Sequence, residues 1–545
     1  MTPMETNPMN TDTFDYIVVG AGSGGAAAAA RLSESGQHSV LLLEAGPRDK
    51  NIWTKIPLGV AEVLSRGIYL RDFFTEPDPQ LHDRKIYWPR GWATGGSSTV
   101  NGMVWVHGTP HLYDEWASDG CPGWSYDELR PWFRKIESFK GGDSAYRGAS
   151  GPMTITEFQS NNSLADDFLD AIVAAKVGPR VKDYNAGGFG GSRMQMNTRN
   201  GVRCNTRMAY LDPAEGRPNL TVMTETFATR IRFDGKRAVG IEARSAGREV
   251  SLNARKEIIL CGGAFNTPQL LELSGVGRRE VLGAAGVPLL HELPMVGENL
   301  SEHVYSPIVY RTKPGVSWNG TLNSAVGKLG AGLRYVTRRD GPLSSNTITA
   351  QAFVPEQSGG AKADVKLQIQ QISTSGNRGK GKVEIDQHDG VTIASFQIRP
   401  HSRGSAHITS RDPAANARMI SNHFTDARDV DACLTALKMT RRIAAAGPMA
   451  RWIVGEERPG PSCGSDEALI DYLRATGATA WHPVGTCRIG SDAAQSVVDP
   501  HLRVHGLQGL RIADGSAMPT IASTNTNAIC IVMGERVADF IQQGA

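Results

Sequence analysis

The stretch that most restricts the fold of this chain lies near its N-terminus, where residues 15–36 read DYIVVGAGSGGAAAAARLSESG. A short apolar run, a glycine turn and an alanine-rich segment that stops near Gly36 predict a buried strand followed by a helix. The next apolar run, SVLLLEAG, predicts a second strand that ends at Glu44. This order is typical of the opening of a β-α-β unit with parallel strands.

The glycines of this turn have the spacing of a nucleotide-binding motif. Gly20, Gly22 and Gly25 form G-x-G-x-x-G, and Glu44 follows 19 residues after the third glycine. Such glycines allow a tight turn, a close approach of a pyrophosphate and close packing of helix on strand, while the helix N-terminus binds the phosphates. Glu44 suits an unphosphorylated ribose diol. The motif predicts an adenine dinucleotide and leaves FAD and NAD both open.

The length of 545 residues predicts two lobes instead of one core. Alternating segments in the middle, ADVKLQIQQIS and VTIASFQIRP, predict a separate sheet with one covered face, whereas LQGLRIADGSAMP and NAICIVMGERVADFIQQ return to the dinucleotide-binding pattern. We therefore predict an α/β protein, α+β overall, with a discontinuous Rossmann-like domain and an inserted substrate domain on a mostly antiparallel sheet. The predicted ranges are 12–157, 206–306 and 476–545 for the first domain, and 158–205 and 307–475 for the second.

Composition excludes several other classes of protein. The net charge is +3 without a basic block, which argues against nucleic acid as a partner. Seven scattered cysteines without a C-x-x-C pair favour reduced thiols and a cytoplasmic location. The polar N-terminus lacks a signal-peptide pattern, and the absence of an 18-residue apolar run predicts no membrane span.

Four segments together resemble one enzyme family. They are ATGGSSTVNGMVWVHG at 93–108, GGAFNTPQLLELSGVG at 262–277, WHPVGTCRIG from Trp481 and NTNAICIVMGER from Asn525. With the glycine motif, they are similar to the glucose–methanol–choline (GMC) family of FAD-dependent alcohol oxidoreductases over essentially the whole chain. The resemblance implies FAD as the cofactor. Val100 stands where some members attach FAD through a histidine, so we expect non-covalent FAD here.

The resemblance also implies which residues contact the cofactor. Asn101, Gly102, Met103 and Val104 would lie beside the isoalloxazine, Ala228 near the adenine, and Asp514 and Gly515 near the ribityl and pyrophosphate groups. Asn527 and Ala528 would lie at the pyrimidine edge, where the amides that begin a helix stabilise negative charge on reduced flavin. Capping of that helix by Asn525 or Asn527 is the alternative. The complete predicted set is Gly20, Gly22, Ser23, Gly25, Glu44, Ala45, Gly95, Asn101, Gly102, Met103, Val104, Ala228, Asp514, Gly515, Asn527 and Ala528.

The implied activity is oxidation of a primary alcohol to the aldehyde, with hydride transfer to flavin N5. His482 matches the family's base, since an imidazole among uncharged neighbours has the required pKa range, and Asn525 matches the group that bonds the same substrate oxygen. The electron acceptor is oxygen or an unidentified compound, and the oligomeric state stays open. Alternatives are a lyase that uses FAD without redox change, a photochemical enzyme and, less favoured, an NAD-dependent dehydrogenase.

The remaining signals are weaker. We interpret His107, His303 and His505 as hydrogen-bonded structural residues, and the spacing of the histidines predicts no metal site. Strand alternation places Lys366, Gln368 and Gln370 on one face of the inserted sheet and Leu367, Ile369 and Gln371 on the other. The sequence leaves open which face looks at the flavin. A glutamine-lined roof would suit a polar, uncharged or heteroaromatic alcohol.

Overall fold

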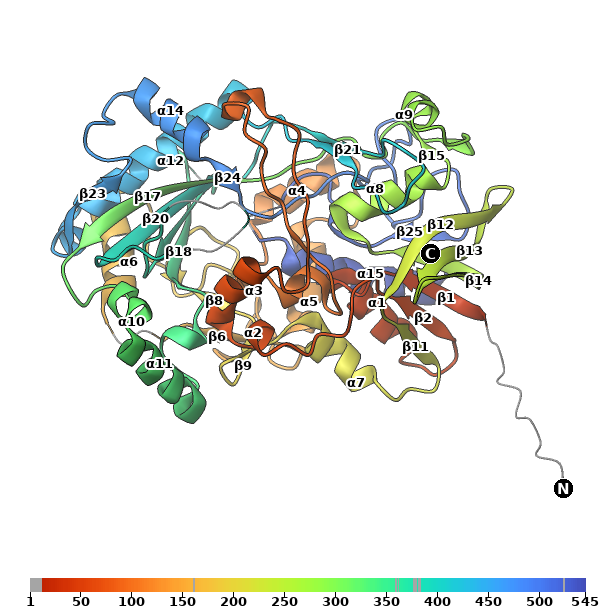
Figure 1. Ribbon diagram of the computed structural model, residues 1–545, viewed down its shortest axis with the longest axis horizontal. Coiled ribbons are helices and arrows are strands. Elements are labelled where there is room, and N and C mark those ends of the chain that lie inside the picture. The colour runs from red at the N-terminus through yellow and green to blue at the C-terminus, as the bar shows by residue number, and fades with distance from the viewer. Residues whose placement is uncertain are drawn as a thin grey trace.

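The computed structural model describes residues 12–159, 162–357, 360, 362–375, 380, 384–522 and 525–545. Two seven-stranded sheets form the frames of two lobes that lie side by side (Figure 1). The first sheet lies at the right of Figure 1 and the second at the left. The mixed α/β architecture with a largely antiparallel second sheet confirms the predicted fold class.

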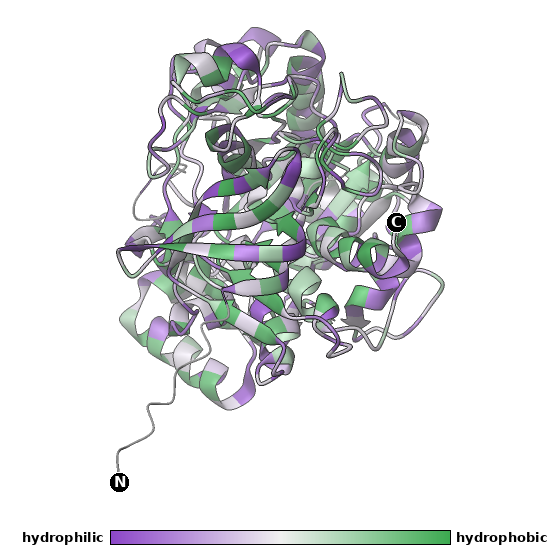
Figure 2. Ribbon diagram, turned by 90° about the vertical axis from the view of Figure 1, so that its right-hand side faces the viewer, coloured by the Kyte–Doolittle hydropathy of each residue, from purple (hydrophilic) through white to green (hydrophobic). Residues whose placement is uncertain are grey.

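The first sheet has a parallel centre with an antiparallel extension. Its strands are β1 (Thr13–Val19), β2 (Val40–Leu43), β11 (Leu220–Met223), β12 (Thr226–Asp234), β13 (Arg237–Ser245), β14 (Arg248–Leu260) and β25 (Leu510–Ile512), in the order β11-β2-β1-β14-β13-β12 with β25 beside β14. β1 is parallel to both β2 and β14, as the β-α-β prediction requires. The antiparallel β12 and β13 face the viewer in Figure 2, where hydrophilic and hydrophobic positions alternate along the strands.

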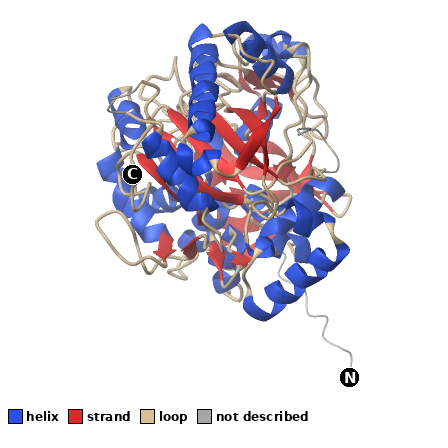
Figure 3. Cartoon of the chain, turned by 90° about the vertical axis from the view of Figure 1, so that its left-hand side faces the viewer, coloured by secondary structure: helices blue, strands red, loops and turns tan. Residues whose placement is uncertain are grey.

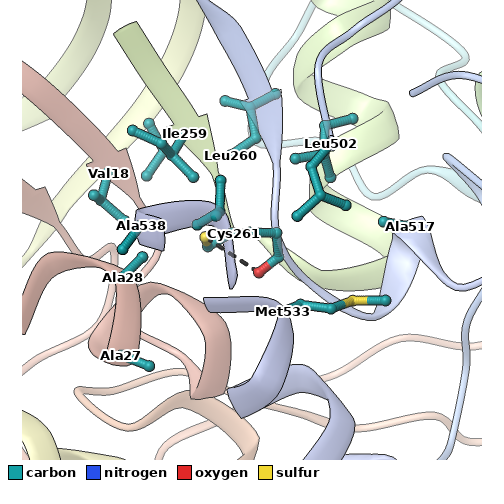
Figure 4. Packing of buried hydrophobic residues seen from close by; sticks show 14 of the residues in the cluster. Val18, Ala27, Ala28, Ile259, Leu260, Cys261, Leu502, Ala517, Met533 and Ala538 are labelled. Atoms are coloured by element: carbon teal, nitrogen blue, oxygen red, sulfur yellow. Dashed lines mark hydrogen bonds between the residues drawn. The ribbon is translucent and has the colours of Figure 1, made fainter. Parts of the chain in front are cut away.

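Glycines let this sheet pack closely against its helices. Gly20 has φ +103°, and a Cβ on Gly25 would lie 1.8 Å from the Gly20 carbonyl oxygen, so helix α1 (Ser23–Leu32) can start here only with glycine at both positions. A Cβ on Gly534 of α15 (Asn527–Gln543) would lie 2.1 Å from the Gly24 oxygen, which explains how α1 and α15 touch. Val18, Ala28 and Met533 belong to the dry core between them (Figure 4).

The second sheet is antiparallel throughout its main path. Its strands are β7 (Gly190–Arg193), β17 (Val304–Thr312), β18 (Ile348–Val354), β19 (Val365–Gln370), β20 (Gly390–Gln397), β23 (Ile453–Arg458) and β24 (Ala478–Thr479). The order is β23-β17-β20-β19-β18-β7, with β24 beside β17. The sheet thus combines strands from the middle of the chain with one from before residue 200 and one from after residue 475.

Helices cover only one face of this second sheet. α6 (Leu164–Ala174) packs on β7 and β18, and α12 (Ala427–Ala445) packs on β17, β19 and β20, in front of the strands in Figure 3. Leu367 and Ile369 of β19 are buried in the core under these helices. The opposite face, with Lys366, Gln368 and Gln370, lines a cavity. The structure therefore decides the question that strand alternation left open.

The remaining helices and strands connect and flank the two sheets. The other helices are α2 (Ile52–Lys55), α3 (Val60–Arg66), α4 (Pro110–Ser118), α5 (Tyr126–Ile136), α7 (Asp212–Ala214), α8 (Gly263–Leu273), α9 (Arg279–Ala284), α10 (Asn319–Asn323), α11 (Ala325–Arg338), α13 (Gly447–Ala450) and α14 (Asp466–Thr476). The other strands are β3 (Leu70–Arg71), β4 (Arg90–Gly91), β5 (Glu137–Phe139), β6 (Met153–Glu157), β8 (Gln195–Met196), β9 (Thr198–Arg199), β10 (Val202–Arg203), β15 (Val276–Gly277), β16 (His291–Glu292), β21 (Ser405–His407) and β22 (Arg418–Ile420). All seven cysteines carry free thiols. In the described part of the chain, none of the helices has the length and apolar character needed to cross a bilayer.

Candidate active site

One cavity of about 1190 Å³ lies between the carboxyl edge of the first sheet and the polar face of the second. A drug-sized ligand usually occupies roughly 300–1,000 Å³, so this cavity has room for a dinucleotide and a substrate. The predicted residues that line it are Gly20, Gly22, Ser23, Glu44, Ala45, Asn101, Gly102, Met103, Val104, Ala228, His482, Asp514, Gly515, Asn525 and Asn527. The other three predicted residues, Gly25, Gly95 and Ala528, do not line the cavity.

Two observations fit the dinucleotide end of the cavity. A Cβ added to Gly22 would meet only the Gly96 Cα, at 4.0 Å, so this glycine leaves open space where a phosphate can approach the backbone. The Asn527 carboxamide oxygen accepts a hydrogen bond of 2.7 Å from the Ser23 hydroxyl, whereas its buried nitrogen has no partner among the described residues. A buried donor without a partner at the cavity wall suits a ligand acceptor.

Two buried carboxylates hold the backbone around this end. Glu44 accepts hydrogen bonds from the amides of Ala21 and Gly46, both 2.9 Å long, and burial raises its pKa to about 7. Asp514 accepts from the Gly263 amide and the Thr267 hydroxyl at 2.8 and 2.6 Å, and burial raises its pKa as well. Both acids anchor the cavity-lining loops and retain lone pairs for a ligand hydroxyl.

The loop predicted to contact the isoalloxazine is held in a tight turn. The Asn101 carboxamide oxygen accepts from the Met103 amide at 2.9 Å and from Arg203 Nη1 at 2.8 Å. Met103 has φ +58°, a conformation that few non-glycine residues adopt. Gly102 and Val104 flank it on the cavity wall. The Asn101 oxygen therefore fixes the loop and is not free for a cofactor.

The alternative role of Asn525 or Asn527, capping of the helix, does not occur in the structure. Helix α15 begins at Asn527 after Thr526, and no side chain caps its first amides. The Asn527 oxygen bonds Ser23, and Asn525 turns toward the second sheet. The amides at this helix end thus remain available to the cavity.

A buried glutamate positions the loop that carries His482. The Glu302 carboxylate accepts hydrogen bonds from Trp88 Nε1, the Thr479 hydroxyl and the backbone amides of His303 and His482. Trp481, with φ +66°, reverses the chain just before the histidine. Atoms of Glu302, His303 and His482 lie within 4.8 Å of one another, a spacing that could hold a cation. The hydrogen bonds account for this arrangement, and the predicted lack of a metal site stays a prediction.

Hydrogen bonding determines which nitrogen of His482 carries the proton. His303 Nε2 lies 2.9 Å from the Ile398 carbonyl oxygen and must donate to it, since a carbonyl oxygen only accepts. Burial lowers the pKa of His303 to about 4, so this ring is neutral and its Nδ1 is an acceptor. The 3.2 Å contact between the two Nδ1 atoms then requires His482 Nδ1 to donate. The Nε2 of neutral His482 is therefore unprotonated.

Asn525 and Lys366 extend this chain of hydrogen bonds on the other side. Asn525 Nδ2 donates to His482 Nε2 over 2.9 Å, and Lys366 Nζ donates to Asn525 Oδ1 over 2.8 Å. Lys366 comes from β19 of the second sheet, so both lobes contribute to one site. The sequence predicted His482 and Asn525 as site residues, and the fold brings their side chains into contact.

The sequence interpretation missed the roles of two further residues. His303, interpreted as structural, contacts the His482 ring directly and sets its tautomer. For Lys366, the sequence predicted only the strand face and not the hydrogen bond to Asn525. No signal in the sequence pointed to the first contact, because His303 and His482 lie 179 positions apart. By contrast, His107 bonds Glu137 and His505 bonds Ser496, as expected of structural histidines.

The chain belongs to the GMC oxidoreductase family. Sequence models of that family match residues 14–305 and 400–534. The chain is 36% identical over 542 residues to an oxygen-dependent choline dehydrogenase of Photobacterium profundum, covering 98% of this chain and 93% of the relative. It is 38% identical over 541 residues to an uncharacterized GMC-type oxidoreductase of Mycobacterium tuberculosis, covering 97% of this chain and 99% of the relative.

Solved structures share the fold of this chain. Pyridoxine 4-oxidase from Mesorbium loti superposes with a TM-score of 0.86 at 27% identity, covering 97% of this chain and 99% of that chain. A formate oxidase superposes with a TM-score of 0.89 at 24% identity over 98% of both chains, which supports the fold. This protein is thus an FAD-dependent oxidoreductase, and the choice between FAD and NAD that the glycine motif left open is settled.

Proposed function

We propose that this enzyme oxidises a primary alcohol to the aldehyde with His482 as the base. The observation that carries this proposal is the position of His482 Nε2 at the cavity wall, 2.9 Å from the Asn525 amide nitrogen that donates to it. An imidazole nitrogen held in this tautomer accepts a hydroxyl proton without prior rearrangement. Relatives named for choline and pyridoxine support an alcohol as the substrate class.

The residues of the chain perform three tasks in this reaction. His482 Nε2 accepts the hydroxyl proton, and Asn525 Nδ2 donates a hydrogen bond to the substrate oxygen once that oxygen enters between them. His303 orients the His482 ring because its Nδ1 accepts a hydrogen bond from His482 Nδ1 throughout the reaction. This hydrogen bond favours the His482 imidazolium that forms when the substrate proton is taken up. Bound FAD supplies the acceptor for the hydride that leaves the carbinol carbon.

Gly20, Gly22 and the start of α15 would hold this FAD without a covalent bond, because Val100 stands at the attachment position. We propose oxygen as the first electron acceptor to test, since the choline dehydrogenase relatives are named oxygen-dependent. Release of all flavin into the supernatant after acid precipitation would agree with non-covalent binding. Flavin that stays in the pellet would contradict it.

The test is an anaerobic titration of the yellow protein with aliphatic, aromatic, heteroaromatic and polyol alcohols, followed through the flavin absorbance. Bleaching by one class, with the aldehyde as product, supports the proposal and identifies that class. Recovery in air within seconds marks an oxidase, and slow recovery marks a dehydrogenase. A protein that keeps its colour with every alcohol yet cleaves a cyanohydrin, or reacts only in light, would overturn the proposal.

A further inference from the structure

Lys366 is a buried amine in the substrate half of the cavity. Its side chain is 1% exposed and lines the cavity wall. On β18 and β20, the residues paired with it are Phe353 and Phe396, whose ring centroids lie 5.9 and 5.4 Å from Nζ. An amine in such a place needs partners, because burying an unpaired charge is costly.

The protein supplies fewer partners than the amine can use. An ammonium has three N–H donors, and among the described residues only the neutral Asn525 oxygen accepts one. None of the described carboxylates lies within 4.0 Å of Lys366 Nζ. The acids that line the cavity are Glu44, Glu62, Glu384, Asp386 and Asp514. Asp386 pairs with Arg458, Glu62 with Arg66, and Glu44 and Asp514 anchor backbone amides.

We infer that the alcohol substrate carries a carboxylate, which Lys366 binds while His482 and Asn525 hold the hydroxyl. The inference rests on the proposed alcohol oxidation and names its substrate class. One carboxamide separates the amine from the base, so a molecule that bridges them needs only a short spacer. The positive charge of Lys366 disfavours a quaternary ammonium substrate such as choline. An alcohol with a carboxylate also takes the place of the polar, uncharged alcohol that the glutamine-lined face led us to expect.

The electrostatics of the site agree with this assignment. Burial lowers the pKa of Lys366 to about 7, and the charge of Lys366 contributes to the lowered pKa of His303. A carboxylate beside the amine would favour its ammonium form and supply the missing counter-charge. The two faces of Phe353 and Phe396 would enclose the pair and exclude water.

The experiment compares three kinds of substrate on one scaffold: neutral benzyl alcohol, its anionic 3- and 4-carboxylates, and the cationic trimethylammonium analogue. We expect kcat/KM to fall in the order carboxylate, neutral, cation. Lys366→Met should lower kcat/KM about 10- to 100-fold more for the carboxylates than for the neutral and cationic alcohols, as for loss of a hydrogen bond to a charged group, while Lys366→Arg keeps the order. Gln368→Met, which removes a polar group without charge from the same face, should affect all three alike.

A binding assay separates the two proposals. Benzoate titrated into the holoenzyme should perturb the flavin spectrum in the wild type and in Lys366→Arg, and should bind at least tenfold more weakly to Lys366→Met. Equal benzoate affinity of wild type and Lys366→Met, or faster turnover of the cation, would overturn the inference. Failure of every alcohol to bleach the flavin would instead overturn the proposed function. Flavin content per protein checks that each variant is folded.

A second, independent observation concerns helix α11 at the edge of the second lobe (Figure 1). Val326, Leu329, Leu333 and Val336 are 80%, 76%, 64% and 69% exposed and recur at helical spacing on one face. The opposite face holds the helix in place, since the Tyr335 hydroxyl donates to the Gly201 oxygen at 3.0 Å. Soluble monomers seldom leave so continuous an apolar stripe uncovered.

The charges of this helix are basic. They are Lys328, Arg334, Arg338 and the C-cap Arg339, and the helix contains no acidic residue; Asp340, which follows, pairs with Arg334. An apolar face with basic flanks is the pattern of helices that lie in the surface of an anionic bilayer. We propose that α11 binds the protein to an anionic lipid surface. Leu322 and Asn323 of α10 and Lys328 line the cavity, so the bound surface would adjoin its mouth.

The test is co-sedimentation of the holoenzyme with vesicles of phosphatidylcholine and phosphatidylglycerol, with pure phosphatidylcholine as the comparison. We expect binding to the anionic vesicles that falls at least tenfold in the double variant Leu329→Ser, Leu333→Ser and weakens with salt. Val454→Ser, which changes an equally exposed residue of β23, should bind like the wild type. No vesicle binding by the wild type, or a dimer that this double variant dissociates, would overturn the proposal in favour of a second copy.

Discussion

The two walls of the cavity differ in the groups that they present to a ligand. The wall from the first sheet consists of backbone around Gly20, Gly22 and the start of α15, where missing side chains and free amides make the site. The wall from the second sheet consists of the side chains of Lys366, Gln368 and Gln370. A backbone site depends on local spacing, whereas a side-chain site depends on which face of a strand is covered. The difference teaches why cofactor and substrate are not equally predictable.

The largest effect that would test this comparison is at the backbone wall. Gly22→Val should abolish FAD binding, because the added side chain fills the space at the phosphate end of the cavity. Flavin absorbance per protein after purification measures it. Gly283→Val is the matched control, since a Cβ there meets nothing within 4 Å and Gly283 does not line the cavity. Normal flavin content in Gly22→Val would show that this wall does not hold the cofactor.

The next effect is at the base, where the walls meet. His482→Ala should keep FAD and slow its anaerobic reduction by about 10²-fold or more, as for loss of a general base. Stopped-flow absorbance with the best alcohol measures the rate. His505→Ala, whose ring bonds Ser496 outside the site, should reduce at a nearly normal rate. If His482→Ala kept the wild-type rate, another residue would have to take the proton.

A smaller effect is expected at His303, which contacts the base and not the substrate. His303→Leu should retain FAD and slow reduction about 10- to 100-fold, because the His482 ring loses the acceptor that sets its tautomer. His303→Gln, which can still offer an acceptor, should recover part of the rate and of the pH profile. An unchanged pH profile in both variants would make His303 a packing residue only.

The smallest expected effect concerns the side-chain wall and the charge of Lys366. Because burial brings the pKa of free Lys366 to about 7, the amine is charged below that pH and loses its charge above it. Benzoate affinity should therefore be full at pH 6 and fall about tenfold by pH 8, since about nine tenths of the amine is then neutral. Lys366→Met should show no such slope. A slope that persists in Lys366→Met would assign the titration to another group.

Much of the backbone wall could be predicted from the sequence. The strand, turn and helix around Gly20–Gly25 and the strand that ends before Glu44 lie where periodicity and glycine spacing place them, because hydrogen bonds and sterics within about thirty residues determine them. The resemblance named His482 and Asn525, which the fold brings to 2.9 Å. The alternative of a side-chain cap on α15 does not occur, and Asn525 instead accepts a hydrogen bond from Lys366 across the cavity.

The sequence by itself determined the family, the dinucleotide motif and the candidate base, since these depend on spacing along one continuous segment. Only the tertiary structure decided that Lys366 faces the cavity, that His303 sets the tautomer of His482 and that Glu302 holds its loop. Each of these contacts joins residues more than 150 positions apart. Such contacts exist only after helices cover one face of the second sheet and leave its polar face to the cofactor lobe.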